Sequence, residues 1–410
     1  MVITRRTAGL GLAATFLTAC TGGMPQSSAP SRMRAVPNPA FDSWVAGFRA
    51  RAAAQGIDPQ VAARAFRGAG YLPGVIERDR NQTEFTRSLE DYLAIAASDE
   101  RVATGRAMLR RHGALLARIE AHYGVEAPVV CAIWGLESRY GARRGDVPVI
   151  SALATLAYDG RRGAFYEKQL IAALRILQNG DTTADRMVGS WAGAMGHTQF
   201  IPTSYQAYAV DFTGDGRRDI WSDDPTDALA SAAAYLSRSG WRRGQPWGLE
   251  VALPQGFDMG LTGRGTSRGA GQWAALGLRA ASGGALPDHG PASVLAPAGA
   301  GAPAFLVFRN FSVILRYNNA EKYGIGIGHL SDRIAGGPPL YGRFGPDATG
   351  LTLADRKALQ QRLTRAGYDT QGADGVIGDN TRTAITAYQR ARGLPVTGAP
   401  SRALLRHLGG

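Results

Sequence analysis

The stretch VEAPVVCAIWGLESRYG, residues 125–141, determines how the rest of this chain is interpreted. Its positions from Val129 to Leu136 are nearly all apolar. This pattern predicts a buried helix over residues 126–139. A single acid, Glu137, falls in the last turn of the predicted helix and is followed by Ser-Arg-Tyr-Gly.

A carboxyl group at the end of an apolar helix has an unusual environment. Desolvation disfavours the charged form and raises the pKa of a carboxyl. The partial negative charge at a helix C-terminus acts in the same direction. These conditions suit a general acid that stays protonated near neutral pH, as glycoside cleavage requires. The alternative is that Glu137 pairs with Arg139 or Arg143 at a surface helix end.

A second stretch, SWAGAMGHTQFIPTSY (residues 190–205), strengthens the first interpretation. It combines small residues, aromatic residues, and amide or hydroxyl groups, and it is too rich in glycine for an ordinary core helix. Glycine lets a sugar ring approach the backbone, because it has no side chain. Amide groups and flat aromatic faces supply the contacts that carbohydrate binding uses. The two stretches together favour a glycan-cleaving site.

Three ordered motifs resemble those of the lytic murein transglycosylase B family, which is glycoside hydrolase family 103. The motifs are GLESRYG, then AGAMGxxQFxPxSY, then Arg316-Tyr317-Asn318, and the similarity covers roughly residues 39–334. The resemblance implies a mainly α, lysozyme-like catalytic domain over 39–334. Thr203 stands where the family usually has serine, and the sequence after Tyr323 is richer in glycine than usual.

The resemblance also implies roles for individual residues. Glu137 would be the sole catalytic acid and base, and Ser190 would orient its carboxyl group. The other substrate-binding residues implied by the motifs are Met195, Gln199, Phe200, Tyr205, Tyr317, Asn318 and Tyr323.

The implied reaction is non-hydrolytic cleavage of the bond between N-acetylmuramic acid and N-acetylglucosamine. Glu137 would protonate the bridging oxygen and then accept the proton of the sugar's own C6 hydroxyl, which closes a 1,6-anhydro ring. Water is not consumed, so one carboxylate suffices and no cofactor is required for the chemistry. A hydrolytic muramidase would normally need a second acid, such as Asp159 or Asp146. A catalytically inactive wall-binding scaffold is the other alternative.

The segment DFTGDGR, residues 211–217, spaces oxygen ligands as an EF-hand-like calcium loop does. Position 12 of such a loop is serine here, so a neighbouring aspartate would replace the usual glutamate. The resembled family often has a calcium-type site at this place. The predicted ligands of a structural calcium ion are Asp211, Thr213, Asp215, Arg217 and Asp224. Otherwise the segment is a turn rich in Asp and Gly.

The other helical patterns cover residues 101–122, 149–158 and 164–178, and residues 304–308 give the best strand signal. Between 244 and 304 glycine, alanine and proline are dense and periodicity weakens. Residues 335–350 are predicted to be a linker.

Residues 351–410 form a separate unit with three predicted helices. Thr352 and Asp355 predict a capping box at the first. The unit resembles the peptidoglycan-binding domain 1 family, which implies that glycan strands of the wall are the partner. A basic surface for anionic polymers, or a purely structural cap, are the alternatives.

The N-terminus predicts export. Residues 1–20 combine a short basic region with an apolar run too short to span a bilayer, and Leu17-Thr-Ala-Cys20 resembles a bacterial lipobox. Cys20 would be acylated, residues 21–38 would form a flexible tether, and Arg5-Arg6 leaves Sec or twin-arginine export open. The chain is therefore expected to be periplasmic, lipid-anchored and monomeric.

The remaining composition is consistent with this interpretation. The net charge of +13 favours an anionic partner, and a nucleic acid is suggested by charge alone and is not expected. With Cys20 acylated, Cys131 is alone in an apolar run and is expected to be buried and inert. No other run is long enough to span a membrane.

Overall fold

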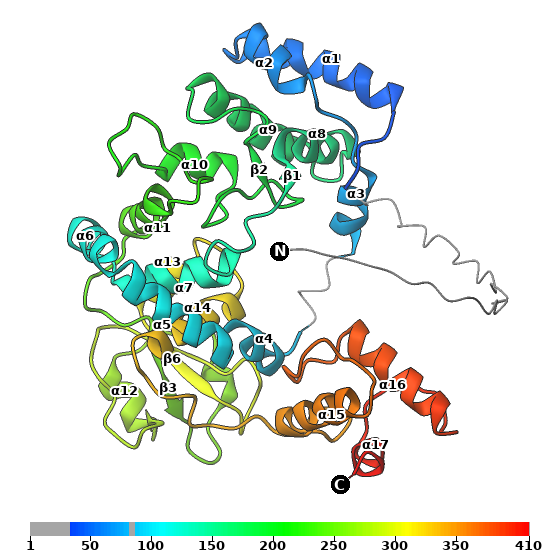
Figure 1. Ribbon diagram of the computed structural model, residues 1–410. Helices are drawn as coiled ribbons and strands as arrows, with labels where there is room; N and C mark the ends of the chain where they lie inside the picture. The colour runs from blue at the N-terminus through cyan, green and yellow to red at the C-terminus, as the bar shows by residue number, and fades with distance from the viewer. Residues whose placement is uncertain (1–32, 82–86, 410) are drawn as a thin grey trace, which may run out of the picture.

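The computed structural model describes residues 33–81 and 87–409 of the 410-residue chain. The predicted signal peptide, Cys20 and most of the predicted tether lie outside the described residues. We call residues 33–334 the main body and residues 351–409 the C-terminal module. Both are mainly helical, as predicted, and Figure 1 shows the C-terminal module beside the part of the main body that carries α4.

The helices of the main body agree with most of the sequence-based predictions. They are α1 (Pro39–Ala54), α2 (Pro59–Phe66), α3 (Pro73–Arg80), α4 (Leu89–Ala96), α5 (Asp99–Arg111), α6 (Gly113–Tyr123), α7 (Ala127–Ser138), α8 (Val149–Asp159), α9 (Gly163–Gln178), α10 (Pro202–Tyr208), α11 (Thr226–Arg238), α12 (Ala270–Ala275), α13 (Arg309–Ile314) and α14 (Glu321–Ile334). The single helix predicted over 101–122 is in fact two, α5 and α6, which meet at His112.

Helix α7 is the central element of the main body. It contacts α5, α6, α11 and α14, and most of its side chains are fully buried. A helix that is apolar on all sides requires neighbours on all sides. The apolar run from Val129 to Trp134 therefore accounts for the central position of α7. Cys131 lies within this run, is buried and free, and burial raises its pKa to about 12, as expected for an inert thiol.

A small antiparallel sheet forms a second core in the region where periodicity weakens. Its order is β4-β3-β6-β5, with strands β3 (Gly248–Ala252), β4 (Arg279–Ala280), β5 (Ser293–Leu295) and β6 (Ala304–Val307). Leu249 of β3 and Val294 of β5 both pair with Leu306 of β6. Only β6 was predicted from the sequence. Strands of two to five residues are too short for a period of two to stand out.

A two-stranded ribbon brings two distant segments together beside the end of α7. Strand β1 (Val147–Pro148) pairs with β2 (Val188–Gly189) in antiparallel register. The segment that follows α7 therefore lies next to the glycine-rich stretch that begins at Ser190. This pairing brings the two stretches singled out in the sequence to one place.

The C-terminal module has three helices and its own core. They are α15 (Leu353–Arg365), α16 (Asp379–Ala391) and α17 (Arg402–His407), packed around a cluster that includes Leu359 and Ile385. The predicted capping box is present at α15: the Asp355 amide donates to Thr352 Oγ1, and Asp355 Oδ2 accepts from the Thr352 amide.

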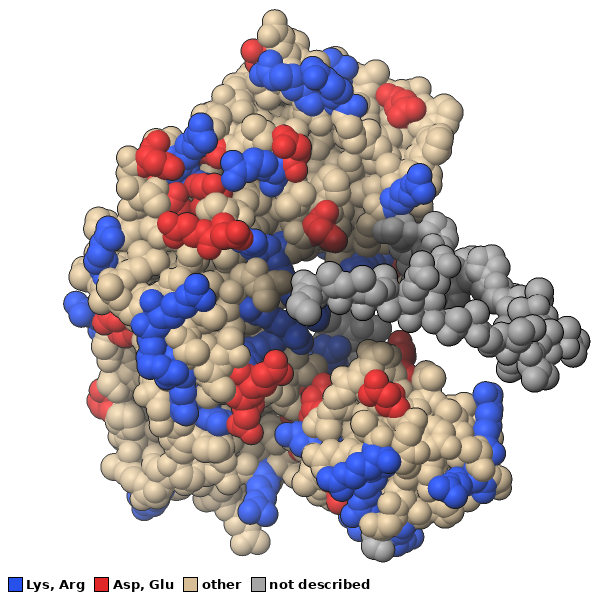
Figure 2. All heavy atoms as spheres, in the orientation of Figure 1, with Lys and Arg blue, Asp and Glu red and all other residues tan. Residues whose placement is uncertain are grey.

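The space-filling view shows one hollowed face of the molecule. Figure 2 shows Lys and Arg atoms gathered in the hollow at the centre of this face, with the C-terminal module at its lower right border. Over the part of the chain that is described, no helix combines the length and the apolar character needed to cross a bilayer.

Candidate active site

Glu137 occupies the penultimate position of α7, where the chain turns sharply. The two residues after the helix, Arg139 and Tyr140, have φ of 50° and 57°, and Gly141 has φ of 86°. Two consecutive non-glycine residues in the left-handed region are uncommon, and such strain concentrates at functional sites. The turn separates the half-buried Glu137 from the exposed Arg139 that follows.

The turn is held by Tyr140, which requires glycine at position 135. The Tyr140 hydroxyl donates to the backbone oxygen of Arg101 at 2.8 Å. A Cβ atom at Gly135 would lie 2.5 Å from the Tyr140 ring, and one at Gly105 would lie 2.4 Å from its hydroxyl. These distances are shorter than carbon and oxygen atoms can approach. Gly135 and Tyr140 of the GLESRYG motif therefore determine the shape of this turn.

His197 joins the end of α7 to the second stretch, a role that the sequence analysis missed. Trp134 Nε1 donates to His197 Nδ1 at 3.1 Å, so the ring proton lies on Nε2, which donates to the Ser222 backbone oxygen at 2.8 Å. Ser138 Oγ donates to the His197 backbone oxygen at 2.6 Å. Burial lowers the pKa of His197, although the bond to Ser222 opposes this shift, and the ring remains neutral near pH 7.

Two tyrosines lie with Glu137. Tyr323, on α14, donates its hydroxyl to Glu137 Oε1 at 2.6 Å. Tyr317 donates to the Thr198 backbone oxygen at 3.1 Å. Burial and the charge of Glu137 raise the pKa of both tyrosines well above the usual value. Both hydroxyls therefore stay protonated and able to donate. Glu137 itself is half-buried.

Gln199 and Ser190 lie at the second stretch in partly exposed positions. Gln199 has φ of 52°, and its Nε2 donates to the backbone oxygens of Arg144 and Gly196. This fixes the side chain between the two stretches. Ser190 Oγ accepts from the amides of Ala192 and Ala194 at 3.3 and 3.0 Å. That Ser190 orients Glu137 stays a prediction.

Three residues expected to contact substrate are buried instead. Met195 and Tyr205 are 0% exposed and Phe200 is 2% exposed. Phe200 packs against the rings of Tyr317 and Tyr235, and Tyr205 donates to the Arg218 backbone oxygen at 2.6 Å. These apolar side chains form the core beneath the loop. The sequence cannot distinguish an aromatic residue that supports a groove from one that lines it.

Asn318 is exposed, and its Oδ1 accepts from the Ala320 amide at 3.1 Å. This bond stabilises the turn into α14, the helix that carries Tyr323.

Two acids were considered for a hydrolytic mechanism. Asp159 forms an ion pair with Arg80 at 2.8 Å, and Asp146 is exposed in the loop before β1.

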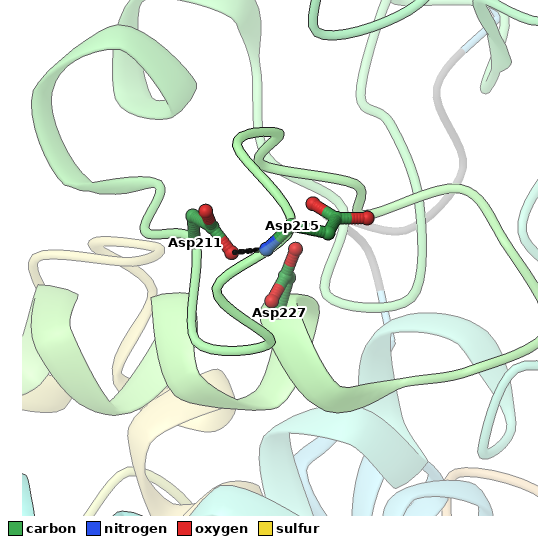
Figure 3. A group of neighbouring side chains, drawn as sticks. All are labelled: Asp211, Asp215 and Asp227. Atoms are coloured by element: carbon green, nitrogen blue, oxygen red, sulfur yellow. Dashed lines mark hydrogen bonds between the residues drawn. The ribbon is translucent and has the colours of Figure 1, made fainter.

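Three aspartates converge in the predicted metal loop, and one of them differs from the prediction. Figure 3 shows the side chains of Asp211, Asp215 and Asp227 gathered at this loop, with the bond from the Asp215 amide to Asp211 dashed. One carboxylate oxygen from each lies within 4.8 Å of the others. Asp224, predicted as a ligand, instead accepts from the amide and hydroxyl of Thr226 at the start of α11. Asp227 takes its place, because the loop is longer than the twelve-residue template.

The donor chemistry at this cluster fits a hard divalent cation. Asp227 is buried, and its carboxylate accepts from the amides of Phe212, Thr213 and Asp219. Burial raises the pKa of Asp227, these amides oppose the shift, and the charge of Asp211 adds to it. Carboxylate oxygens held close together are the ligands that calcium and magnesium prefer. Thr213 is near the cluster, and its hydroxyl donates to Asp211 Oδ1 at 3.1 Å, whereas Arg217 contributes its amide to Asp215 at 2.9 Å.

Comparisons with known sequence families agree with this geometry. Residues 40–332 match the family described as "Transglycosylase SLT domain", and residues 352–408 match "Putative peptidoglycan binding domain". The membrane-bound lytic murein transglycosylase B of Escherichia coli is 34% identical over 220 residues, which is 52% of this chain and 58% of that protein. The chain thus aligns with little more than half of that curated relative.

Solved structures extend the similarity over both domains. SltB3 from Pseudomonas aeruginosa, in complex with NAG-NAM-pentapeptide, is 49% identical with a TM-score of 0.74, covering 90% of this chain and 100% of that one. The same protein is known in complex with NAG-anhNAM-pentapeptide. E. coli lytic transglycosylase Slt35, in complex with calcium, is 29% identical with a TM-score of 0.62, covering 73% and 93%.

Proposed function

Because this chain belongs to the transglycosylase SLT family, we propose that it is a peptidoglycan lytic transglycosylase that forms 1,6-anhydro-muramyl ends. The single observation that carries the proposal is the bond from Tyr323 to Glu137, which holds one carboxyl at the end of a buried helix. That carboxyl lies beside a stretch shared with enzymes of this family. The complex of SltB3 with an anhydro-muramyl peptide supports the non-hydrolytic outcome.

Glu137 has two successive tasks in this reaction. Its proton passes to the bridging glycosidic oxygen as the bond to C1 breaks, and an oxocarbenium-like centre develops at C1. The carboxylate then accepts the proton of the C6 hydroxyl, whose oxygen bonds to C1. The proton returns to Glu137, so atoms balance without water. The neutral hydroxyl of Tyr323 holds the carboxyl in one orientation through both steps.

Product analysis tests the proposal. Purified sacculi digested by the full chain should release muropeptides whose ends are one water lighter than hydrolysed ends. Glu137→Gln should release none, because the amide keeps the shape and lacks the titrating proton. Hydrolysed ends would instead favour a muramidase, and undiminished release by Glu137→Gln would remove Glu137 from the mechanism.

We propose that calcium, when bound, is held by Asp211, Asp215 and Asp227. The three converging carboxylates support this ligand set, and the calcium complex of Slt35 supports the choice of metal. A divalent cation there would neutralise the carboxylates and order the loop. We assign it no step in the reaction.

Further proposals concern the location and partners of the protein. We propose that the C-terminal module binds glycan strands of the wall, and that the protein acts as a periplasmic, lipid-anchored monomer. The E. coli relative is named membrane-bound, which supports the membrane location. Cys20→Ala should move the protein from the membrane fraction to the soluble exported fraction. Salt-resistant membrane association of that variant would contradict acylation.

A further inference from the structure

We infer that the cavity between the main body and the C-terminal module binds the carboxylates of the peptide stems carried by the glycan strand. The inference rests on the proposed function and adds a substrate feature that neither domain would recognise alone. The cavity, of about 670 Å³, is lined by α4–α5 and the turn after α7 on one side. On the other side it is lined by Lys357 and residues 371–374 of the C-terminal module.

The two walls of this cavity are held together by a buried arginine. Arg356 of α15 has a side chain that is 4% exposed, and it forms ion pairs with Glu90 and Asp91 of α4, each at 2.8 Å. It also pairs with Asp347 at 2.9 Å. The predicted linker is anchored as well, because the amides of residues 341 and 342 donate to the Glu250 carboxylate. The C-terminal module is therefore docked, and the cavity is a defined site.

The cavity contains four cations that form no hydrogen bond or ion pair within the described residues. Across the described part of the chain, no hydrogen bond or ion pair engages the guanidinium of Arg101, Arg139 or Arg143, or the ammonium of Lys357. Every other charged group in the lining is acidic. Four cations converge here, three from the main body and one from the C-terminal module.

The acids that line the same cavity do not neutralise these cations. Asp99 pairs with Arg333 at 3.1 Å. Asp374 Oδ1 accepts from the Val376 amide and from Gln360. Glu100 is the third acid and interacts with Arg101 through charge alone. Burial lowers the pKa of Arg101, and the charge of Arg139 acts in the same direction. A bound carboxylate would relieve this repulsion.

The position of the cavity identifies the source of the carboxylate. Arg139 follows Glu137 by two residues, so their backbones are at most about 7 Å apart. A strand cleaved at Glu137 carries its peptide on the muramyl sugar, as the NAG-NAM-pentapeptide bound to SltB3 does. An extended pentapeptide spans about 17 Å, which is enough to pass from the turn after α7 into the cavity. In a peptide-bearing strand the sugars are neutral, and the carboxylates belong to the peptide.

The test removes one cation from each wall. Arg143→Gln combined with Lys357→Gln takes away one cation from the main body and one from the C-terminal module, and leaves the bond between Tyr323 and Glu137 in place. The control, Arg110→Gln combined with Arg365→Gln, removes the same charge from exposed positions on α5 and α15, outside the cavity. Each pair is placed in the full chain with and without Glu137→Gln.

Binding is measured calorimetrically with NAG-NAM-pentapeptide and the Glu137→Gln proteins. The ligand is prepared with free stem carboxylates and, separately, with those carboxylates amidated. The cavity variant should bind the free ligand about tenfold more weakly than its control, which corresponds to ~1.4 kcal/mol. The two proteins should bind the amidated ligand equally. On sacculi, the active cavity variant should show a raised KM with kcat little changed.

Several outcomes would overturn the inference. An equal loss of affinity for the free and amidated ligands would mean that the substitutions act through structure. Equal affinity of the cavity variant and the control for the free ligand would mean that the stem binds elsewhere. If the unsubstituted chain yields no anhydro products, the proposed function fails, while the calorimetric comparison still decides whether the cavity binds stem carboxylates.

Discussion

The hydroxyl of Tyr323 donates a hydrogen bond to Oε1 of Glu137 across 2.6 Å, although the two residues are 186 positions apart in the chain. The acid comes from α7 and its partner from α14, and these helices pack directly against each other. The orientation of the catalytic carboxyl therefore depends on how the two helices pack. Burial raises the pKa of Tyr323 well above its usual value, so its hydroxyl stays protonated and can donate this bond near neutral pH.

Tyr323→Phe should lower kcat by roughly ten- to a hundredfold, because a hydrogen bond to a charged group contributes about 1.5–3 kcal/mol. KM should change little, since the ring and its packing remain. Initial rates on soluble glycan strands provide the measurement. Tyr317→Phe is the matched control, because that hydroxyl donates to a backbone oxygen and not to Glu137. Equal losses in the two variants would show that the effect is not specific to the hydrogen bond with Glu137.

Asp215→Asn should abolish the thermal stabilisation that calcium gives, whereas Asp224→Asn should retain it. Asp215 contributes an oxygen to the converging carboxylates, while Asp224 only accepts from Thr226, which asparagine can also do. A ligand at a hundred times its Kd stabilises the native state by about 2.7 kcal/mol. The measurement is the change in Tm between calcium and chelator. Loss of the calcium-dependent stabilisation in both variants would restore the ligand set predicted from loop spacing.

Arg356→Met should destabilise the chain by about 3 kcal/mol, because it leaves three partly buried carboxylates without the arginine that they share. The measurement is chemical unfolding of the full-length protein. A double-mutant cycle with Asp91→Asn separates the interdomain pair from other effects. Strictly additive losses would mean that Arg356 and Asp91 do not stabilise the interdomain contact together.

The free energy of unfolding should fall on acidification, because His329 is buried in its neutral form. Burial, with a contribution from Arg333, lowers the pKa of His329 to about 4, whereas an unfolded chain binds this proton near pH 6.5. Between these values the unfolded state holds more protons, so stability is present above pH 6.5 and is lost as pH falls toward 4. The loss is on the order of 3 kcal/mol. His329→Gln should lose correspondingly less between pH 7 and pH 4.5 in urea unfolding; identical slopes would exclude this contribution.

The sequence predicts the parts of this structure that depend on local pattern. The apolar run of α7 and the position of Glu137 at its end can be predicted from the sequence, because both lie within one helix. The hydrogen bond from Tyr323 to Glu137 cannot be predicted from local pattern, since it depends on the packing of two helices that are far apart in sequence. Tyr205 was predicted to bind substrate and is fully buried, because composition does not reveal which side of a loop faces the core.

Two other features lie beyond sequence patterns for different physical reasons. Asp227 is sixteen positions after Asp211, and the helix start at Thr226 turns it back toward the loop. A template of fixed spacing selects Asp224 instead. Arg356 is one of many arginines in a basic chain, and nothing in its neighbourhood distinguishes a buried interdomain contact from a solvated charge. Both assignments require the tertiary structure.

The turn after α7 has a consequence for how such sequences evolve. Gly135 and Tyr140 maintain the bend, whereas Glu137 is the residue of the GLESRYG motif to which we assign the proton transfers. If that assignment is correct, a single substitution at position 137 would abolish catalysis and leave the bend, the docked module and the cavity beside it intact. Descendants carrying Gln at position 137 would still be recruited to the wall and would compete with their active paralogues for the same strands. A match to the other positions of the motif therefore indicates common ancestry. The acid at position 137 distinguishes an active enzyme from an inactive relative that competes with it for glycan strands.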